Sequence, residues 1–196
     1  MTDFVHLHLH TEYSLLDGAV KVDDLIDHCV KQGIDAVAVT DHGNMYCSLK
    51  FAEKCKANHI IAIIGCEFYL VDHDPKLHLD QKAEHLILLA KNRTGYINLV
   101  QLDSYAFVDG FYYRPRISYD MLKEHSDGVI CLSACLAGRI PRLLSEGKYE
   151  EAKNFALRMK EIYGEDFYLE IQDHGIPEQK RILPESSFPQ EGHPLA

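Results

Sequence analysis

Residues 34–44 read IDAVAVTDHGN, an apolar run that passes directly into a polar turn. The near-continuous apolar stretch over residues 34–40 is typical of a parallel strand that is covered on both faces. Asp41 and His42 follow this strand at once, so two side chains capable of chemistry stand where it ends. In folds built from parallel strands and helices, chemistry gathers at the carboxyl ends of the strands. This stretch therefore predicts an α/β fold with a functional site at one edge of its sheet.

Strands and helices alternate on both sides of this stretch. Apolar residues that alternate with histidine predict a strand over 4–9, and residues 22–32 form an amphipathic helical pattern that Gly33 closes. Further strands are predicted at 60–71, 85–90, 128–133 and 167–171, and further helices at 45–58, 94–105 and 149–163. This alternation, with a short turn after each strand, is typical of a parallel β/α architecture, most simply a barrel.

The end of the chain breaks this pattern. Residues 182–196 (ILPESSFPQEGHPLA) carry three prolines, two serines and a glycine, and they show neither helix nor strand periodicity. Proline and glycine in such a cluster disfavour regular structure. We therefore expect one domain over residues 1–181, followed by an irregular or disordered tail over 182–196.

Length and composition bound the class of protein. The 196 residues suit one domain, and 46% hydrophobic with 26% charged residues are typical of a soluble globular protein. The apolar runs are shorter than the roughly 18 residues that span a bilayer. The start MTDFVHLHLH lacks the basic and apolar regions of a signal peptide. We therefore expect a cytoplasmic protein with no membrane partner.

The charge balance bears on nucleic acid as a partner. A net charge of −10 argues against sequence-independent DNA binding by counterion release. It does not exclude DNA as a substrate, because bound metal cations would reverse the local field. The six cysteines form no CxxC pair and indicate reduced thiols.

Side chains that bind metals recur at the ends of the predicted strands. His8 and His10 are two residues apart, so on a strand both point to one face. Imidazole, carboxylate and thiolate groups hold divalent zinc, manganese or iron. A single His-x-His is weak evidence, but such side chains recur at or near other strand ends, at Asp17, Asp41, His42, Glu67, His85 and Cys135. This recurrence predicts a metal site.

Segments along the chain resemble, in order and spacing, the polymerase and histidinol phosphatase (PHP) family of metal-dependent phosphoesterases: HLHLHTEYSLLDG, AVTDHGNMY, IIGCEFY, EHLILLAKN, FYYRPRIS and ICLSACLAG. The resemblance covers residues 4–181 and points to the amino-terminal domains of bacterial replicative DNA polymerase III alpha subunits. It implies an α/β fold, a distorted (β/α)7 TIM-like barrel with metal ions at the carboxyl ends of the strands. The family's final Asp-x-His, on a strand after a further helix, has no match here, so we expect the last β/α unit to be lacking.

The resemblance assigns a role to each matching position. The metal ligands would be His8, His10, Asp17, His42, Glu67, His85 and Cys135. These are too many ligands for one tetrahedral ion, so we expect a cluster of two or three zinc, manganese or iron ions. The catalytic core would comprise His8, His10, His42 and Glu67, with Glu67 as a candidate bridging carboxylate. Asp41 would orient an imidazole by accepting its other N–H.

Two further pairs of residues leave alternatives open. Arg114 and Arg116, in YRPRIS, could hold a substrate phosphate bidentately or could lie in a solvated loop. Asp173 and His174 belong to the family's sequence but are not among its usual ligands. They could approach the metal site or could serve a structural loop.

The resemblance implies metal-dependent hydrolysis of phosphoesters, with a DNA 3′ end as substrate in a proofreading 3′→5′ exonuclease. The partners would then be the rest of a polymerase alpha chain, which carries the nucleotidyltransferase activity, and other replisome subunits. Two alternatives remain. The domain could be a metal-stabilised structural or docking module of the polymerase, or a free-standing phosphatase for small molecules. The segments FYYRPRIS and SACLAGRIP favour a polymerase domain over the free-standing phosphatase.

Overall fold

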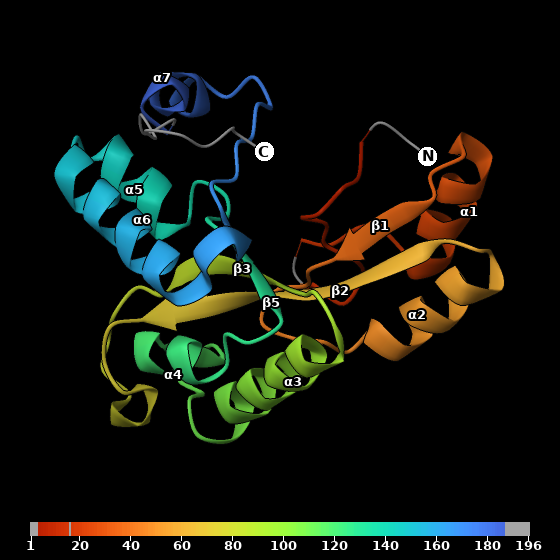
Figure 1. Ribbon diagram of the computed structural model, residues 1–196, viewed down its shortest axis with the longest axis horizontal. Coiled ribbons are helices and arrows are strands. Elements are labelled where there is room, and N and C mark those ends of the chain that lie inside the picture. The colour runs from red at the N-terminus through yellow and green to blue at the C-terminus, as the bar shows by residue number, and fades with distance from the viewer. Residues whose placement is uncertain (1–3, 16, 187–196) are drawn as a thin grey trace.

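A mixed sheet organises the computed structural model, which describes residues 4–15 and 17–186 (Figure 1). Its strands are β1 (Ala36–Val39), β2 (Ile61–Val71), β3 (Glu84–Ala90), β4 (Arg116–Ser118), β5 (Val129–Leu132) and β6 (Phe167–Tyr168). Its helices are α1 (Val22–Gln32), α2 (Ser48–Ala57), α3 (Arg93–Val108), α4 (Tyr119–Glu124), α5 (Arg139–Ser145), α6 (Tyr149–Tyr163) and α7 (Pro177–Ser186), with short 3-10 turns η1 (Pro75–Leu77) and η2 (Gly164–Asp166). Helices α1 and α2 flank the β1 side, whereas α5, α6 and α7 gather at the other end of the molecule (Figure 1).

The strands run in the order β1-β2-β3-β5-β6, and β4 pairs with β2. β2 is parallel to β1 and β4, and β5 is parallel to β6, but β3 runs antiparallel to both β2 and β5. The all-parallel expectation therefore does not hold for β3. The connection from β2 to β3 contains only η1, and parallel pairing would require a longer crossover. As a result β3 begins at the edge where β2 and β5 end.

The described part of the sheet does not close into a barrel, since β1 and β6 remain its two outer strands. This agrees with a PHP-type barrel that lacks a unit. The predicted strand over 4–9 lies beside β1 without forming a regular ladder. Ala38 N–H donates to His6 O, and Thr40 N–H donates to Leu9 O. The step from Ala38 to Thr40 is two residues, whereas the step from His6 to Leu9 is three, so one extra residue in the N-terminal segment breaks the ladder.

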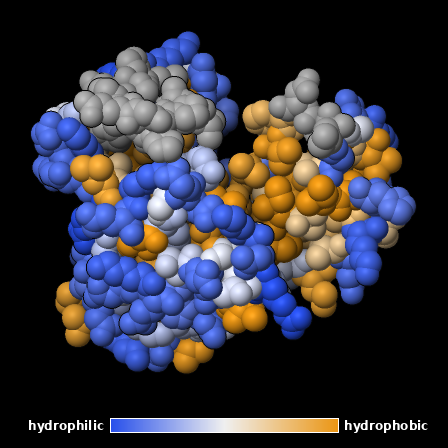
Figure 2. Space-filling model, in the orientation of Figure 1, coloured by the Kyte–Doolittle hydropathy of each residue, from blue (hydrophilic) through white to orange (hydrophobic). Residues whose placement is uncertain are grey.

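The apolar surface is concentrated near this segment. Figure 2 shows hydrophobic residues gathered over the lobe that contains the N-terminal segment, β1 and α1, while much of the other lobe is hydrophilic on this face. Exposed apolar side chains of the N-terminal region include Phe4, Leu7 and Leu15. The unclosed edge of the sheet at β1 and this apolar surface therefore lie at the same end of the molecule.

The two faces of the sheet have different contents because side chains alternate along each strand. On β2, the buried side chains of Cys66, Phe68 and Leu70 join a large core together with residues of α3, α5 and α6. Glu67 comes between them and points to the opposite, inner face. In the antiparallel register Tyr69 pairs with His85, so His85 also lies on this inner face. Alternation thus places two predicted metal ligands on one surface.

Several elements differ from the sequence-based expectation. β4, α4, α5 and α7 were not predicted, because each is too short or too irregular in its apolar spacing to stand out. Residues 182–186, expected in the irregular tail, continue α7. This helix packs on α5 and buries Gln179 and Ile182, and Pro177 suits a first helical position. Residues 187–196 of the predicted tail lie outside the described residues. None of the described helices is long and apolar enough to span a membrane.

Candidate metal centre

Glu67 lies on the inner face of the sheet, and its fully buried carboxylate is surrounded by four histidines. Its Oε2 atom lies 3.1 Å from His8 Nε2 and 3.7 Å from His10 Nε2. Its Oε1 atom lies 2.5 Å from His42 Nδ1 and 2.7 Å from His85 Nδ1. Each carboxylate oxygen therefore faces one pair of imidazoles, and the carboxylate joins the two pairs.

This donor set fits divalent metal ions. Two groups of donor atoms, each within 4.8 Å of one another, share Glu67: His8, His10 and Glu67 form one, and His42, Glu67 and His85 form the other. A carboxylate without exposure to water requires hydrogen-bond donors or positive charge beside it. Nitrogen and oxygen donors of this kind suit zinc, manganese or iron. Glu67 is a donor common to both groups.

The imidazoles and the carboxylate influence one another's charge. Burial opposes a charge on His8, but hydrogen bonds to Glu170 and Glu67 outweigh burial and raise the pKa of His8 to about 9. The hydrogen bond to Glu67 is the main cause that raises the pKa of His42. Burial dominates at His10 and lowers its pKa. Burial also works against charge on Glu67, yet hydrogen bonds from the surrounding histidines hold its pKa well below the usual range. The carboxylate is therefore ionised at neutral pH, as a metal ligand must be.

A tight turn brings His42 to the carboxyl end of β2. Gly43 N–H donates to Glu67 O at 2.8 Å, so the turn continues the pairing of the sheet beyond β1. Gly43 has a φ of 58°, and a Cβ there would lie 2.8 Å from atoms of Tyr69 and Pro115. Only glycine suits this left-handed and crowded position. The DHG sequence therefore fixes where the His42 ring lies.

Asp41 lies next to the metal centre, and its side-chain contacts differ from those expected. Its Oδ1 atom accepts hydrogen bonds from Thr11 N–H at 2.6 Å and from the Ser14 hydroxyl at 2.9 Å. Its Oδ2 atom accepts from the Thr11 hydroxyl at 2.8 Å and from the Cys47 thiol at 3.1 Å. Ser14 Oγ in turn lies 3.4 Å from His10 Nδ1. The direct contact predicted between Asp41 and an imidazole is thus replaced by a contact through Ser14.

Asp17 and Cys135 lie at opposite margins of the four histidines. Asp17 Oδ2 is 3.0 Å from His42 Nε2, and its side chain is 63% exposed. Cys135 Sγ is 3.7 Å from His85 Nδ1, and burial raises the pKa of this thiol to about 11. Both predicted ligands are therefore next to the centre, but neither belongs to the two groups of converging donor atoms found among the described residues.

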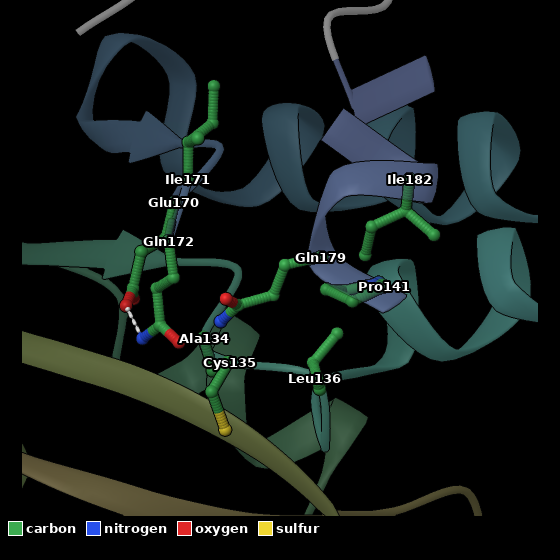
Figure 3. A pocket seen from close by; sticks show the side chains of 9 residues that line it. All are labelled: Ala134, Cys135, Leu136, Pro141, Glu170, Ile171, Gln172, Gln179 and Ile182. Atoms are coloured by element: carbon green, nitrogen blue, oxygen red, sulfur yellow. Dashed lines mark hydrogen bonds between the residues drawn. The ribbon is translucent and has the colours of Figure 1, made fainter. Parts of the chain in front are cut away.

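Glu170 and Gln172 complete the site beyond β6, and sequence patterns did not single them out. Glu170 Oε1 lies 2.6 Å from His8 Nδ1 and accepts a hydrogen bond of 2.6 Å from Gln172 Nε2. Figure 3 shows both side chains beside Cys135, at a cavity of about 20 Å³, roughly the space of one water molecule. Glu170 Oε2 is buried and has no protein partner within the described part of the chain. The available signal was a carboxylate in the predicted strand over 167–171, at the same edge as the other ligands.

The two arginines of YRPRIS have different surroundings. Arg116 is buried, and its guanidinium donates hydrogen bonds to the carbonyl oxygens of Pro75, Leu79 and Gly110. These contacts tie η1 and the following loop to β4, so Arg116 has a structural role in place of the predicted phosphate contact. The guanidinium of Arg114 is exposed and lies 4.9 Å from the centroid of the Tyr69 ring. Arg114 therefore remains the phosphate-binding candidate.

Asp173 and His174 are exposed and form local contacts. Asp173 Oδ1 accepts a hydrogen bond from Gly175 N–H, and His174 N–H donates to Gln179 Oε1. These contacts close the turn that leads into α7. The structure supports the structural role for this pair, and the approach to the metal centre considered from the sequence is not seen.

The geometry and the comparison with known proteins agree on the class of protein. The PHP domain profile matches residues 6–174, and the chain belongs to the PHP family. A solved structure described as a putative metal-dependent phosphoesterase from Bifidobacterium adolescentis has a similar fold, with a TM-score of 0.51 and 17% sequence identity over 94% of this chain and 84% of that one.

The sequence of this chain is similar to the same kind of protein from several bacteria. The chain is 48% identical, over 90% of its length, to the DNA polymerase III subunit alpha of Borreliella burgdorferi. It is 46% identical, over 92% of its length, to that of Treponema pallidum. The chain spans 16% of the length of each of these relatives. This is the group of proteins to which the quoted segments also pointed.

Proposed function

We propose that this chain is a metal-dependent phosphoesterase domain that holds divalent ions on both sides of Glu67. The observation that carries the proposal is a fully buried carboxylate with a pair of imidazoles at each oxygen. Zinc, manganese and iron suit the donor set, and Asp17 and Cys135 at the margins leave room for two or three ions. Membership of the PHP family and the fold shared with a phosphoesterase support this function.

The residues of the chain have separate tasks in the proposed reaction. When bound, divalent ions activate a water molecule and stabilise the negative charge that develops on a transferred phosphoryl group. Glu67 holds the two donor groups together, and Glu170 keeps the His8 ring in one orientation by accepting its Nδ1 proton. Arg114 provides a cation for a phosphate oxygen of the substrate. His8, His10, His42 and Glu67 thus form the proposed catalytic core.

The proposed substrate is the 3′ end of DNA, cleaved in a 3′→5′ direction as in proofreading. The support is the similarity to subunits of DNA polymerase III, which act on DNA. The proposed partners are the remainder of a polymerase alpha chain and other subunits of the replisome. A cytoplasmic location follows from this role.

A structural module is the second candidate, and one observation favours it. The centre is already linked by direct contacts between its own side chains, from Glu170 through His8 and Glu67 to His42 and Asp17. A network of this kind can tie the N-terminal segment to β2 and β6 whether or not a reaction takes place. In this case metal would contribute to stability without turnover. The free-standing phosphatase has no such support.

Metal content and hydrolysis decide between these functions. We expect at least two equivalents of zinc, manganese or iron in protein purified without chelator, and a loss of metal in His8→Ala and Cys135→Ala. His28→Ala, on the exposed face of α1, is the matched control and should retain the bound metal. Release of nucleotides from a 3′-labelled DNA oligonucleotide should disappear with the metal in His8→Ala. Equal release by wild type and His8→Ala would contradict a phosphoesterase at this centre, and bound metal without any hydrolysis would favour the structural module.

A further inference from the structure

A cavity of about 250 Å³ opens directly beside the metal centre. His85, whose Nδ1 atom contacts Glu67, is one of the residues that line it. Residues 80–83, the turn over 112–114, Arg116 and Ala137 line the remainder. Its size is close to the lower end of pockets for small ligands, which are about 300–1,000 Å³. A molecule in this cavity would therefore be in reach of the metal centre at one end.

Arg114 lines the cavity and also contacts Tyr69, a neighbour of the metal ligand candidate His85. Its guanidinium lies over the ring of Tyr69, and the Tyr69 ring centroid is 5.2 Å from that of His85. Within the described residues Arg114 forms no ion pair, and neither does Lys82, which also lines the cavity. Asp80 contributes one negative charge to the same wall. The two cations without an ion pair outnumber it, so the cavity favours an anion.

Tyr113 presents an aromatic ring at the same cavity. Its side chain is 82% exposed, although its backbone φ of 59° is rarely adopted by aromatic residues. Tyr112 N–H donates to Arg114 O at 3.1 Å across this turn. Tyr112 is itself held between His78, stacked at 5.5 Å, and the guanidinium of Arg116. The fold thus holds a strained turn in place and keeps the Tyr113 ring in solvent.

We infer that this cavity is a nucleoside subsite, in which Tyr113 stacks on a base while Arg114 binds the phosphate that faces the metal centre. The inference rests on the proposed function and adds the part of the substrate that lies beside the cleaved bond. Aromatic side chains stack on any base, and this mode of binding tolerates differences in sequence. An exposed ring and an arginine without an ion pair among the described residues line one cavity together with His85, and this combination matches the base and phosphate of one nucleotide.

Binding without turnover tests the subsite. Thymidine 5′-monophosphate and inorganic phosphate are titrated by calorimetry into the zinc-supplemented chain and its variants. Loss of a stacked aromatic ring weakens binding by about fivefold or more. We therefore expect Tyr113→Ala to reduce affinity for the nucleotide at least fivefold more than affinity for phosphate. Tyr113→Phe retains the ring and should bind the nucleotide within about twofold of wild type. Tyr46→Ala removes a tyrosine that is 58% exposed outside the cavity and should leave both affinities unchanged.

The outcomes separate this inference from the proposed function. An unchanged ratio of nucleotide to phosphate affinity in Tyr113→Ala overturns the subsite, as does a wild-type chain that binds the nucleotide no better than phosphate. Hydrolysis of p-nitrophenyl phosphate by the same wild-type preparation reports on the metal centre alone. If the wild type hydrolyses p-nitrophenyl phosphate but Tyr113→Ala does not change the affinity ratio, the phosphoesterase is supported and the subsite is excluded. If Tyr113→Ala changes the affinity ratio but no hydrolysis is found, the subsite is supported on a domain that binds nucleotides and does not cleave them.

Discussion

Glu67 and Asp41 are both buried carboxylates, and they differ in the groups around them. Imidazole nitrogens face both oxygens of Glu67, whereas hydroxyl, backbone N–H and thiol groups donate to Asp41. Hydroxyl and amide donors satisfy a carboxylate permanently and leave it no free position. Imidazoles can release their protons and then accept a metal in place of them. The type of donor, rather than burial, therefore separates a candidate metal ligand from a structural carboxylate.

Asp103, on α3, adds a third case with fewer partners. It accepts a hydrogen bond from the backbone of Met45, while its Oδ1 atom is buried without a partner in the part of the chain that the structure describes. Burial raises the pKa of Asp103 to about 6, whereas the pKa of Glu67 is held low by its histidines. Together with Glu170, these carboxylates give four predictions of decreasing size.

The largest effect is expected from Glu67→Gln, because Glu67 belongs to both groups of donor atoms. The amide replaces a shared anionic ligand, so both donor groups lose the charge that holds a divalent ion. Elemental analysis should show loss of nearly all bound metal, and metal-dependent hydrolysis should fall with it. Glu161→Gln, at an exposed position on α6, is the matched control. Full metal content in Glu67→Gln would show that the ions do not bind at this carboxylate.

Asp41→Asn should act on stability before it acts on metal. The amide cannot accept all four hydrogen bonds from Thr11, Ser14 and Cys47, and hydrogen bonds to a charged acceptor are worth about 1.5–3 kcal/mol each. We expect the free energy of unfolding in urea to fall by about 2–3 kcal/mol. Asp27→Asn, on the exposed face of α1, should change it little. A loss of metal with unchanged stability would place Asp41 among the ligands, and the type of donor would then not separate a structural carboxylate from a metal ligand.

Glu170→Gln should weaken metal binding while leaving the fold intact. It removes the carboxylate that accepts the Nδ1 proton of His8, and changes at such supporting positions typically cost about 10–100-fold in metal affinity. Competition with a chromophoric zinc chelator measures this affinity. Glu170→Asp shortens the side chain but keeps its charge, so partial recovery would identify charge as the main contribution. Wild-type zinc affinity in Glu170→Gln would mean that His8 needs no orienting partner.

Asp103→Asn should give the smallest effect, and its sign depends on pH. The folded state holds the Asp103 proton more tightly than the unfolded state, whose pKa is about 3.9. The contribution to stability is therefore present at low pH and is lost as pH rises through about 6. At pH 7 we expect the variant to be more stable than wild type by about 1–2 kcal/mol, and at pH 4 the two should be nearly equal. Urea unfolding at both pH values measures this, and a difference that does not change with pH would contradict a buried, proton-binding Asp103.

The helices that carry clear apolar periodicity were predicted within a few residues. Gly33 ends α1 with a left-handed cap, as the sequence indicates, and α2, α3 and α6 begin and end close to their expected limits. The strand over 4–9 and the tail over 182–186 were predicted less well. In these cases hydrogen bonding to β1 and packing on α5 decide the conformation, and neither is visible in local spacing.

The sequence by itself determined the helix pattern and the types of side chain that meet at the strand ends. These follow from local periodicity and from the chemistry of each side chain. Only the tertiary structure decided that β3 reverses and brings His85 to the centre, that Glu170 supports His8, and that Arg116 binds carbonyl groups instead of a ligand. Each of these depends on contacts between residues far apart in the chain. Such contacts arise from strand direction and packing, on which the local sequence carries little information.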